Sequence, residues 1–142
     1  MNYNASRPER TAEWDYRGPW YHGSQQPLTV LRTGSSITRN GDLARAFSHR
    51  PSLLSLSDDG TVKHDGTAAG YLYLVAEEVR PEDVSLHPHP ANAARWEWLT
   101  QRELRVLLVK ETQVRERDRL SDEEIAALRR QQQEHGGESF AE

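Results

Sequence analysis

The chain has 142 residues, a net charge of −4 and no cysteine. This length fits one ordinary domain. The lack of a basic excess argues against general nucleic-acid binding, and the lack of cysteine excludes disulfides, thiolate nucleophiles and cysteine zinc sites. No apolar run is long enough to span a membrane, and the N-terminus has no signal-peptide apolar region, so we expect a cytoplasmic protein.

Apolar residues are concentrated in the middle of the chain. Hydrophobic residues make up 35% of the sequence, and few of them lie near either end. This pattern predicts a flexible N-terminal segment over residues 1–17, a folded domain over 18–110 and a charged C-terminal tail over 111–142. Within the N-terminal segment, Trp14 and Tyr16 are expected to dock on the folded domain.

Short apolar runs separated by turn residues predict several strands. The runs cover residues 19–22, 28–31, 35–38, 52–57, 61–64, 70–76, 96–99 and 104–109. The run at 70–76 is aromatic, branched and nearly continuous, which indicates a central buried strand. The last two runs are either two strands or one strand with a kink. Residues 80–90 contain prolines and histidines and are expected to form a loop.

Two helices are predicted from their capping residues. Asn40 or Asp42 can cap a helix over residues 43–49, which is ended by Pro51. In the tail, Ser121 and Glu124 form a capping box for a short helix over 121–135. The sequence has no βαβ rhythm, no Gly-rich dinucleotide loop and no P-loop, so Rossmann and P-loop domains are disfavoured.

Four short motifs follow one another along the folded domain. Tyr21-His22-Gly23-Ser24 closes the first strand, Ser36-Ile37-Thr38 forms another, Phe47 lies on the apolar face of the helix, and Glu97 stands between Trp96 and Trp98. In a strand, Glu97 points away from both tryptophans. If that face meets solvent, Glu97 is a surface residue; if it meets a cleft, the carboxylate is available for chemistry.

This ordered set, from about residue 20 to residue 109, resembles the ADP-ribosyltransferases, especially their diphtheria-toxin-like and poly-ADP-ribose-polymerase branch. The resemblance implies an α+β fold with a split, mostly antiparallel β-sheet core and one or two short helices. It also implies NAD as co-substrate. The cofactor-binding residues would be His22, Gly23, Ser24, Ser36, Thr38, Phe47 and His49, and the catalytic residues Glu97 and His22.

The resemblance assigns a role to each main motif. His22 would donate to the adenine-side ribose of NAD, and the backbone of Gly23 would pair with the nicotinamide carboxamide. Glycine permits this close approach because it has no side chain. Phe47 would stack under the nicotinamide ring, and Ser36 or Thr38 would orient the acid. Glu97 would stabilise the oxocarbenium-like transition state in which the nicotinamide–ribose bond breaks.

Two departures from the family pattern leave alternatives open. The second-strand tyrosine is absent, so a non-catalytic relative that binds a nucleotide or a protein partner is a competing hypothesis. Arg95 stands two residues before Glu97, where members that modify arginine or asparagine carry Glu or Gln, so those acceptors are not supported. The acceptor is a protein, a nucleic-acid base or a small molecule. An RNA 2′-phosphotransferase-like variant, which also uses NAD, is disfavoured by the net charge.

Individual residues also have alternative interpretations. The chain is also similar to the small rifampin ADP-ribosyltransferases, which makes Asp83 the competing acid. Phe47 is an ordinary core residue if it does not stack, and His49 either reaches the pocket or partners the helix C-terminus. His87-Pro88-His89 lacks the i, i+4 spacing of helical metal ligands, so no metal is expected.

Overall fold

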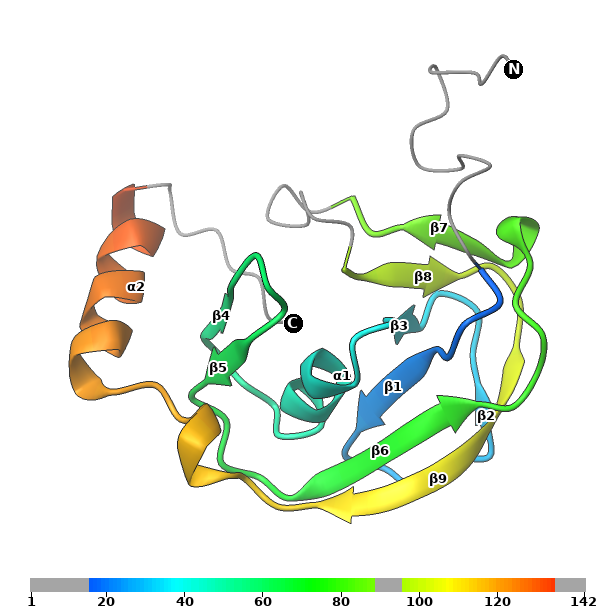
Figure 1. Cartoon of the computed structure of the whole chain (residues 1–142), viewed down its shortest axis with the longest axis horizontal. Helices are drawn as coiled ribbons and strands as arrows, with labels where there is room; N and C mark the ends of the chain where they lie inside the picture. Colours follow the sequence, from blue (N-terminus) through cyan, green and yellow to red (C-terminus); the bar gives the residue numbers. More distant parts are fainter. Residues whose placement is uncertain (1–15, 89–95, 135–142) are drawn as a thin grey trace.

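In the computed structural model, which describes residues 16–88 and 96–134, the longest strands form one antiparallel sheet. Its order is β1 (Tyr21–Ser24), β6 (Gly70–Val75), β9 (Leu104–Thr112) and β2 (Val30–Leu31) (Figure 1). β6 pairs with β1 on one side and with β9 on the other. The prediction of a central buried strand at residues 70–76 is therefore confirmed, with Tyr73 among its buried residues.

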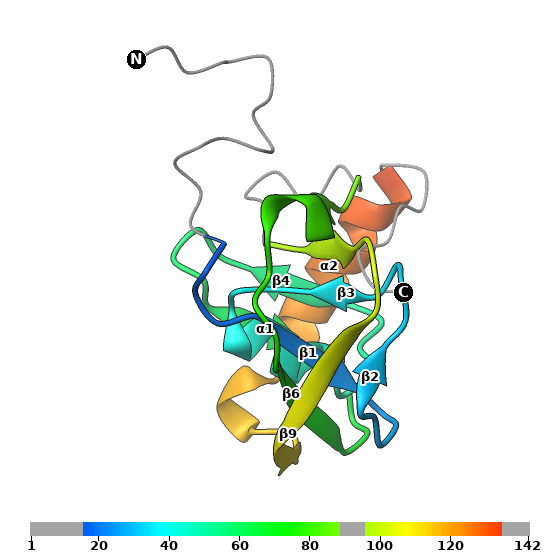
Figure 2. The ribbon, with the colours of Figure 1, turned by 90° about the vertical axis from the view of Figure 1, so that its right-hand side faces the viewer.

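A second antiparallel sheet lies above the first, and β1 is its nearest neighbour in the main sheet (Figure 2). It consists of β3 (Ser36–Ile37), β8 (Trp98–Thr100) and β7 (Val84–Leu86), in that order. An isolated bridge between Tyr21 and Thr38 joins β1 to the end of β3. A third, two-stranded sheet contains β4 (Leu54–Leu56) and β5 (Val62–His64). The fold is α+β with mostly antiparallel sheets, as the sequence predicts.

The segment at residues 80–90 is not the loop that its prolines predict. It contains a 3₁₀ turn, η2 (Pro81–Asp83), followed directly by β7. The Asp83 carboxylate accepts a hydrogen bond from the Arg80 N–H at 2.9 Å, which closes the turn. Val84 is buried and starts a strand that pairs with β8 along its whole length. The runs at 96–99 and 104–109 likewise form two strands, in different sheets.

Both predicted helices are present, with the predicted caps. α1 (Gly41–Phe47) is capped by Asn40, whose Oδ1 accepts from the N–H groups of Asp42 and Leu43 at 2.9 and 3.2 Å. After α1 the chain turns through Arg50, at φ 56°, before Pro51. A short 3₁₀ turn, η3 (Glu116–Asp118), leads to α2 (Asp122–Glu134). Ser121 and Glu124 form the capping box of α2 through two reciprocal hydrogen bonds.

Two apolar clusters hold these elements together. In the larger cluster, the ring of Trp98 meets those of Tyr16 and Trp20 edge to face, each at a centroid distance of 5.8 Å. The prediction that Tyr16 docks on the folded domain is confirmed, whereas Trp14 lies outside the described residues. The smaller cluster joins α1 to the β4-β5 hairpin; its residues are Leu43, Ala46 and Val62, with Phe47, Leu54, Leu56 and Trp96 packed against them.

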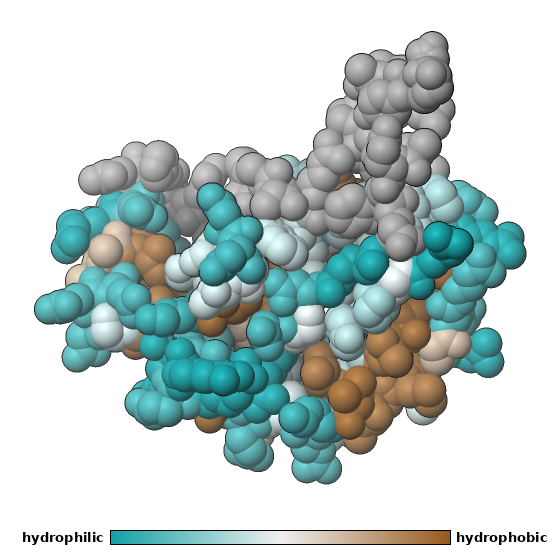
Figure 3. Space-filling view, in the orientation of Figure 1, coloured by the Kyte–Doolittle hydropathy of each residue, from teal (hydrophilic) through white to brown (hydrophobic). Residues whose placement is uncertain are grey.

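β9 carries an exposed apolar strip in the part of its length that β2 does not cover. Leu107, Leu108 and Val109 are all exposed. Figure 3 shows apolar side chains gathered over the β6–β9 side of the molecule. The pairing of β6 with β9 shifts here, since Tyr73 lies opposite Leu108 and Leu72 opposite Lys110. Val109 has no opposite residue in β6, as expected for a β-bulge.

His49 and His64 form a stacked pair between α1 and β5. Both are only 1% exposed, and their ring centroids lie 5.3 Å apart. His49 donates from Nδ1 to the Ala68 carbonyl at 2.7 Å, while Nδ1 of His64 accepts from the Gly66 N–H at 3.0 Å. Burial is the largest cause that lowers the pKa of each imidazole below its ordinary value. Both rings are therefore neutral at neutral pH.

The pair is expected to make the fold sensitive to mild acid. As the pH drops, the unfolded chain takes up protons on these histidines at about pH 6.5, before the native state does. The free energy of unfolding should therefore fall below this pH, and the contribution of the pair should be fully present above it. Urea unfolding at pH 7.5 and 5.5 measures the effect. The variant His64→Gln should show a smaller difference between the two pH values than the parent. An equal difference in both proteins would contradict the assignment.

Candidate functional site

Ser36 connects His22 to Glu97. The Ser36 hydroxyl donates to Oε2 of Glu97 at 2.6 Å, and the Ser36 carbonyl accepts from Nδ1–H of His22 at 2.7 Å. Ser36 lies in β3, Glu97 directly precedes β8, and His22 lies in β1. In the β3–β8 register Ser36 lies opposite Leu99, so Glu97 is its diagonal neighbour on the same face. Residues that are 61 positions apart along the chain are thus brought into direct contact.

Glu97 lies in the interior. It is 5% exposed, which excludes the interpretation of Glu97 as a surface residue. The neighbouring Trp98 fills the larger apolar cluster, so the two side chains leave the backbone on opposite sides, as the alternation of a strand requires. A buried carboxylate needs polar partners, and the Ser36 hydroxyl is one of them. The structure thus places a carboxylate in a buried position beside Ser36, which also contacts His22.

His22 is a neutral imidazole in this setting. Burial lowers its pKa below the ordinary value, and the hydrogen bond to the Ser36 carbonyl opposes this effect without cancelling it. Because a carbonyl only accepts, the proton of the neutral ring lies on Nδ1, and Nε2 carries a lone pair. The resemblance implies that His22 donates to a ribose hydroxyl. The geometry instead makes Nε2 of the neutral ring an acceptor for such a hydroxyl.

The backbone of Gly23 turns away from β6. The Val75 N–H donates to the Trp20 carbonyl at 2.9 Å, and hydrogen-bonded pairs alternate along an antiparallel ladder. Tyr21 and Gly23 therefore direct their N–H and C=O groups to the other side, where Tyr21 exchanges hydrogen bonds of 2.7 and 3.0 Å with Thr38. The turn, loop and bridge hydrogen bonds found among residues 16–88 and 96–134 include none to the Gly23 N–H or C=O. This donor and acceptor pair matches the two faces of a primary amide.

The absence of a side chain at Gly23 has a further cause in the packing of α1. A Cβ atom built at this position would lie 1.8 Å from the Ala44 carbonyl oxygen and 2.8 Å from the Ser48 nitrogen. Glycine is therefore required for α1 to approach β1. The resemblance explains Gly23 by the approach of a ligand to its backbone, and the packing of α1 on β1 requires glycine as well.

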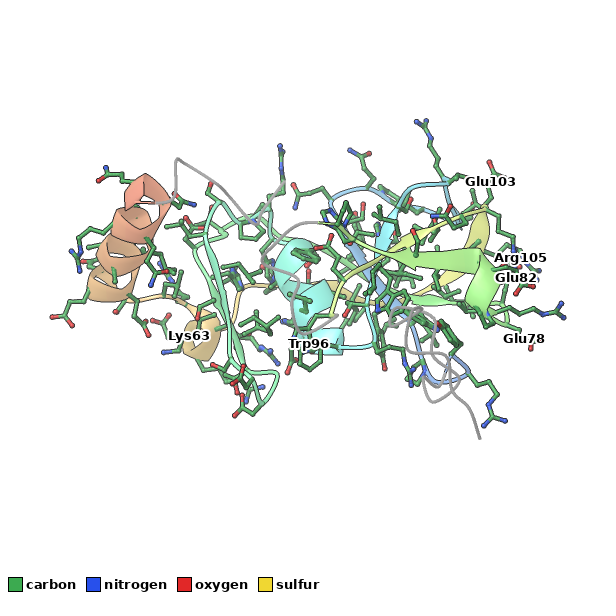
Figure 4. The ribbon with its side chains drawn as sticks, turned by 90° about the horizontal axis from the view of Figure 1, so that it is seen from above. Lys63, Glu78, Glu82, Trp96, Glu103 and Arg105 are labelled. Carbon is green, nitrogen blue, oxygen red and sulfur yellow. The ribbon has the colours of Figure 1, made fainter. Side chains whose placement is uncertain are left out.

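Phe47 and Trp96 belong to the same apolar cluster. Phe47 is half-buried at the end of α1, and Figure 4 shows Trp96 beside this helix. Trp96 directly precedes Glu97, so the cluster adjoins the carboxylate along the chain. The packing of Phe47 on Leu43 and Val62 is that of an ordinary core residue. Stacking of Phe47 on a ligand stays a prediction.

Three other residues that were expected to contact a ligand form hydrogen bonds within the fold. The Ser24 hydroxyl accepts from the Gln26 N–H at 3.0 Å, which closes the turn after β1. Thr38 is buried, and its hydroxyl accepts from the Asn40 N–H at 3.0 Å. His49 is buried against His64 and the Ala68 carbonyl, on the β5 side of α1. The candidate site defined by these contacts includes none of the three, and their contact with NAD stays a prediction.

Asp83, the competing acid, has a different role. It lies next to Val84, which pairs with Thr100, whereas Glu97 lies beyond the other end of the β7–β8 pair. The Arg102 guanidinium contacts the Asp83 carboxylate at 2.9 Å. Burial acts to raise the pKa of Asp83, but the hydrogen bonds and charges of Arg102 and Arg80 outweigh it and lower the pKa. Asp83 is therefore a structural anion that closes η2.

Arg102 extends this ion-pair network to Glu77. Its Nη1 lies 3.0 Å from the Glu77 carboxylate, which also accepts from the Arg105 N–H at 2.7 Å. These hydrogen bonds lower the pKa of Glu77 to about 2. Figure 4 shows Arg105 at the same end of the molecule as Glu78, Glu82 and Glu103, while Trp96 lies near the middle. The network and the Ser36–Glu97 contact thus occupy different regions.

His87 is a site residue that the sequence did not reveal. Its backbone N–H donates to the Glu97 carbonyl at 3.1 Å, which continues the β7–β8 pairing by one residue. Its Nε2 lies 3.8 Å from Oε2 of Glu97. The signal that could have found it is the apolar, polar, apolar order of Val84, Ser85 and Leu86, which is typical of a strand leading into His87.

The chain was compared with protein families, curated proteins and solved structures. No family model, curated protein or solved structure matches it. In the described residues, no group of three or more His, Asp or Glu side chains is arranged to hold a metal ion. No helix within residues 16–88 and 96–134 is long and apolar enough to cross a bilayer.

A separate pocket lies at the start of β1. It has a volume of about 420 Å³ and is lined by residues around Arg17, Trp20, Val75 and Glu77. None of His22, Ser36 and Glu97 lines it. We place the candidate site at Ser36 because it contacts both an imidazole and a buried carboxylate, which are groups that catalysis uses.

Proposed function

We propose that the chain is an NAD-dependent ADP-ribosyltransferase, or an NAD glycohydrolase when water is the acceptor. The observation that carries the proposal is the double contact of Ser36, which holds the His22 imidazole through its carbonyl and the Glu97 carboxylate through its hydroxyl. The acceptor class is a protein, a nucleic-acid base or a small molecule.

Glu97 would drive the cleavage of the nicotinamide–ribose bond. This bond breaks through an oxocarbenium-like transition state, which is stabilised by a nearby negative charge and by hydrogen bonding to the ribose 2′-hydroxyl. Nicotinamide leaves from a cationic nitrogen, so no general acid is required. One carboxylate is therefore sufficient, provided that it is fixed in position. The 2.6 Å hydrogen bond from Ser36 supports this positioning, because it holds Oε2 of Glu97.

Gly23 and His22 would orient the two ends of NAD. The N–H and C=O of Gly23, which point away from β6, would bind the carboxamide of nicotinamide through two hydrogen bonds. Nε2 of His22, one residue earlier on β1, would accept from a ribose hydroxyl, because the Nδ1 proton is already donated to Ser36. Phe47 and Trp96, which pack against the same apolar cluster, would supply the aromatic wall.

Incubation of the protein with NAD, with free nicotinamide as the readout, tests the proposal. We expect nicotinamide release in proportion to protein concentration, with water as the acceptor. The variant Asp83→Asn is the control, because it removes an acid outside the site and should release nicotinamide at the parent's rate. A rise in melting temperature with NAD, but no nicotinamide, would support the non-catalytic alternative. If NAD has neither effect, the proposed function is wrong.

A further inference from the structure

His87 and Glu97 lie at a separation that one oxygen atom can bridge. Nε2 of His87 is 3.8 Å from Oε2 of Glu97, which is longer than a direct hydrogen bond. A single oxygen about 2.8 Å from each of the two atoms would satisfy both hydrogen-bond distances at once. The His87 side chain is 25% exposed and that of Glu97 is 6% exposed, so His87 lies nearer to solvent. An incoming acceptor would therefore meet the imidazole beside the buried carboxylate.

We propose that His87 accepts the proton of the group that attacks the ribose, and that the acceptor class is a hydroxyl, with water as its simplest member. The inference rests on the proposed function. A hydroxyl is a weak nucleophile whose attack is assisted when a base removes its proton, and imidazole is the side chain best suited to this near neutral pH. His87 is thus a catalytic residue in addition to Glu97.

The step balances without any further reactant. The bond between ribose C1′ and nicotinamide breaks, and its electron pair stays on the nicotinamide nitrogen, which becomes neutral. A lone pair of the acceptor oxygen forms the new bond to C1′. The proton of that oxygen passes to Nε2 of His87, in the tautomer that carries its hydrogen on Nδ1, and is then released to solvent.

The other titratable groups of the site are less suited to this role. Glu97 is needed in its charged form to stabilise the oxocarbenium ion, and protonation by the acceptor would remove that charge. Nδ1 of His22 donates to the Ser36 carbonyl, and its Nε2 is already assigned to a ribose hydroxyl in the proposed function. Asp83 is paired with Arg102 beyond the other end of β7. His87 is the base that lies directly beside Oε2 of Glu97.

Competition between two small acceptors tests the role of His87. Methanol must lose a proton when it attacks C1′, whereas the azide anion has none to lose. The parent and His87→Gln are incubated with NAD, methanol and azide, and the methyl and azido products of ADP-ribose are quantified by mass spectrometry. We expect the ratio of azido to methyl product to rise about 100-fold in His87→Gln, the lower end of the usual contribution of a general base. Glu97→Gln should reduce both products together.

The matched control is Ser85→Ala, which changes a residue of the same strand whose hydroxyl contacts Gln101. It should keep the product ratio of the parent. If His87→Gln loses both products equally, or keeps the parent's ratio while NAD is still cleaved, His87 is not the base. If the parent does not cleave NAD at all, the proposed function fails as well. Melting temperatures of the parent and its three variants separate loss of folding from loss of proton transfer.

Discussion

Replacing Glu97 by glutamine is expected to slow nicotinamide release from NAD by about 100- to 1000-fold, the usual effect of removing one group that stabilises transition-state charge. Glutamine has nearly the same shape as glutamate but no negative charge. Its side-chain carbonyl can still accept the hydrogen bond from the Ser36 hydroxyl, which is 2.6 Å from Glu97 in the parent. The variant therefore removes the charge and leaves the packing.

The stability of Glu97→Gln should be equal to that of the parent or higher. Glu97 is 5% exposed, and the burial of a charged group has a desolvation cost that a neutral amide avoids in part. Loss of activity together with unchanged stability is typical of a functional carboxylate. A structural carboxylate would show the opposite combination.

Asp83→Asn provides that opposite combination as a control. Asp83 accepts from the Arg80 N–H and pairs with Arg102, each at 2.9 Å, so the loss of its charge should lower the melting temperature and leave nicotinamide release unchanged. Release of nicotinamide and thermal unfolding are measured on the same samples of all three proteins. Full turnover by Glu97→Gln, with loss of turnover in Asp83→Asn, would exchange the roles of the two acids.

The elements that the sequence predicts well are those specified by local residues. Asn40 caps α1 because its side chain reaches N–H groups two and three residues away, a contact within a single turn of chain. The run at residues 70–76 forms the central strand because nearly every side chain in it is apolar. The position of Glu97 on the face opposite Trp98 follows from the two-residue alternation of a strand. Such features need no knowledge of distant pairing.

The features that the sequence does not reveal depend on distant pairing. β7 is three residues long and lies between prolines, so its strand character comes from pairing with β8. That pairing brings His87 to Glu97. The burial of His49 likewise depends on His64, fifteen residues later on β5, which supplies the ring against which it stacks. In both cases the position of the imidazole depends on a partner residue, and that partner belongs to another element.

Two constraints favour glycine at position 23: the proposed approach of a ligand to its backbone and the packing of α1 on β1. The packing constraint predicts how a larger residue at this position would change the stability of the fold. Replacing Gly23 by alanine is expected to destabilise the fold by about 3 kcal/mol or more, at the upper end of the usual cost of overpacking. The new Cβ would lie 1.8 Å from the Ala44 carbonyl oxygen, and that oxygen belongs to the backbone of α1. Because no flexible side chain can move aside, α1 itself would have to shift away from β1.

Gly41→Ala is the matched control, because Gly41 is the first residue of α1. A Cβ there would lie 3.6 Å from the ring of Tyr21, an ordinary van der Waals distance. Alanine loses less conformational freedom on folding than glycine, so this variant should be as stable as the parent or more stable by about 0.5–1 kcal/mol. Urea unfolding of both variants and the parent measures the difference. If Gly23→Ala unfolds at the same urea concentration as Gly41→Ala, the close packing of α1 on β1 does not explain Gly23, and the approach of a ligand to its backbone would be the reason that remains.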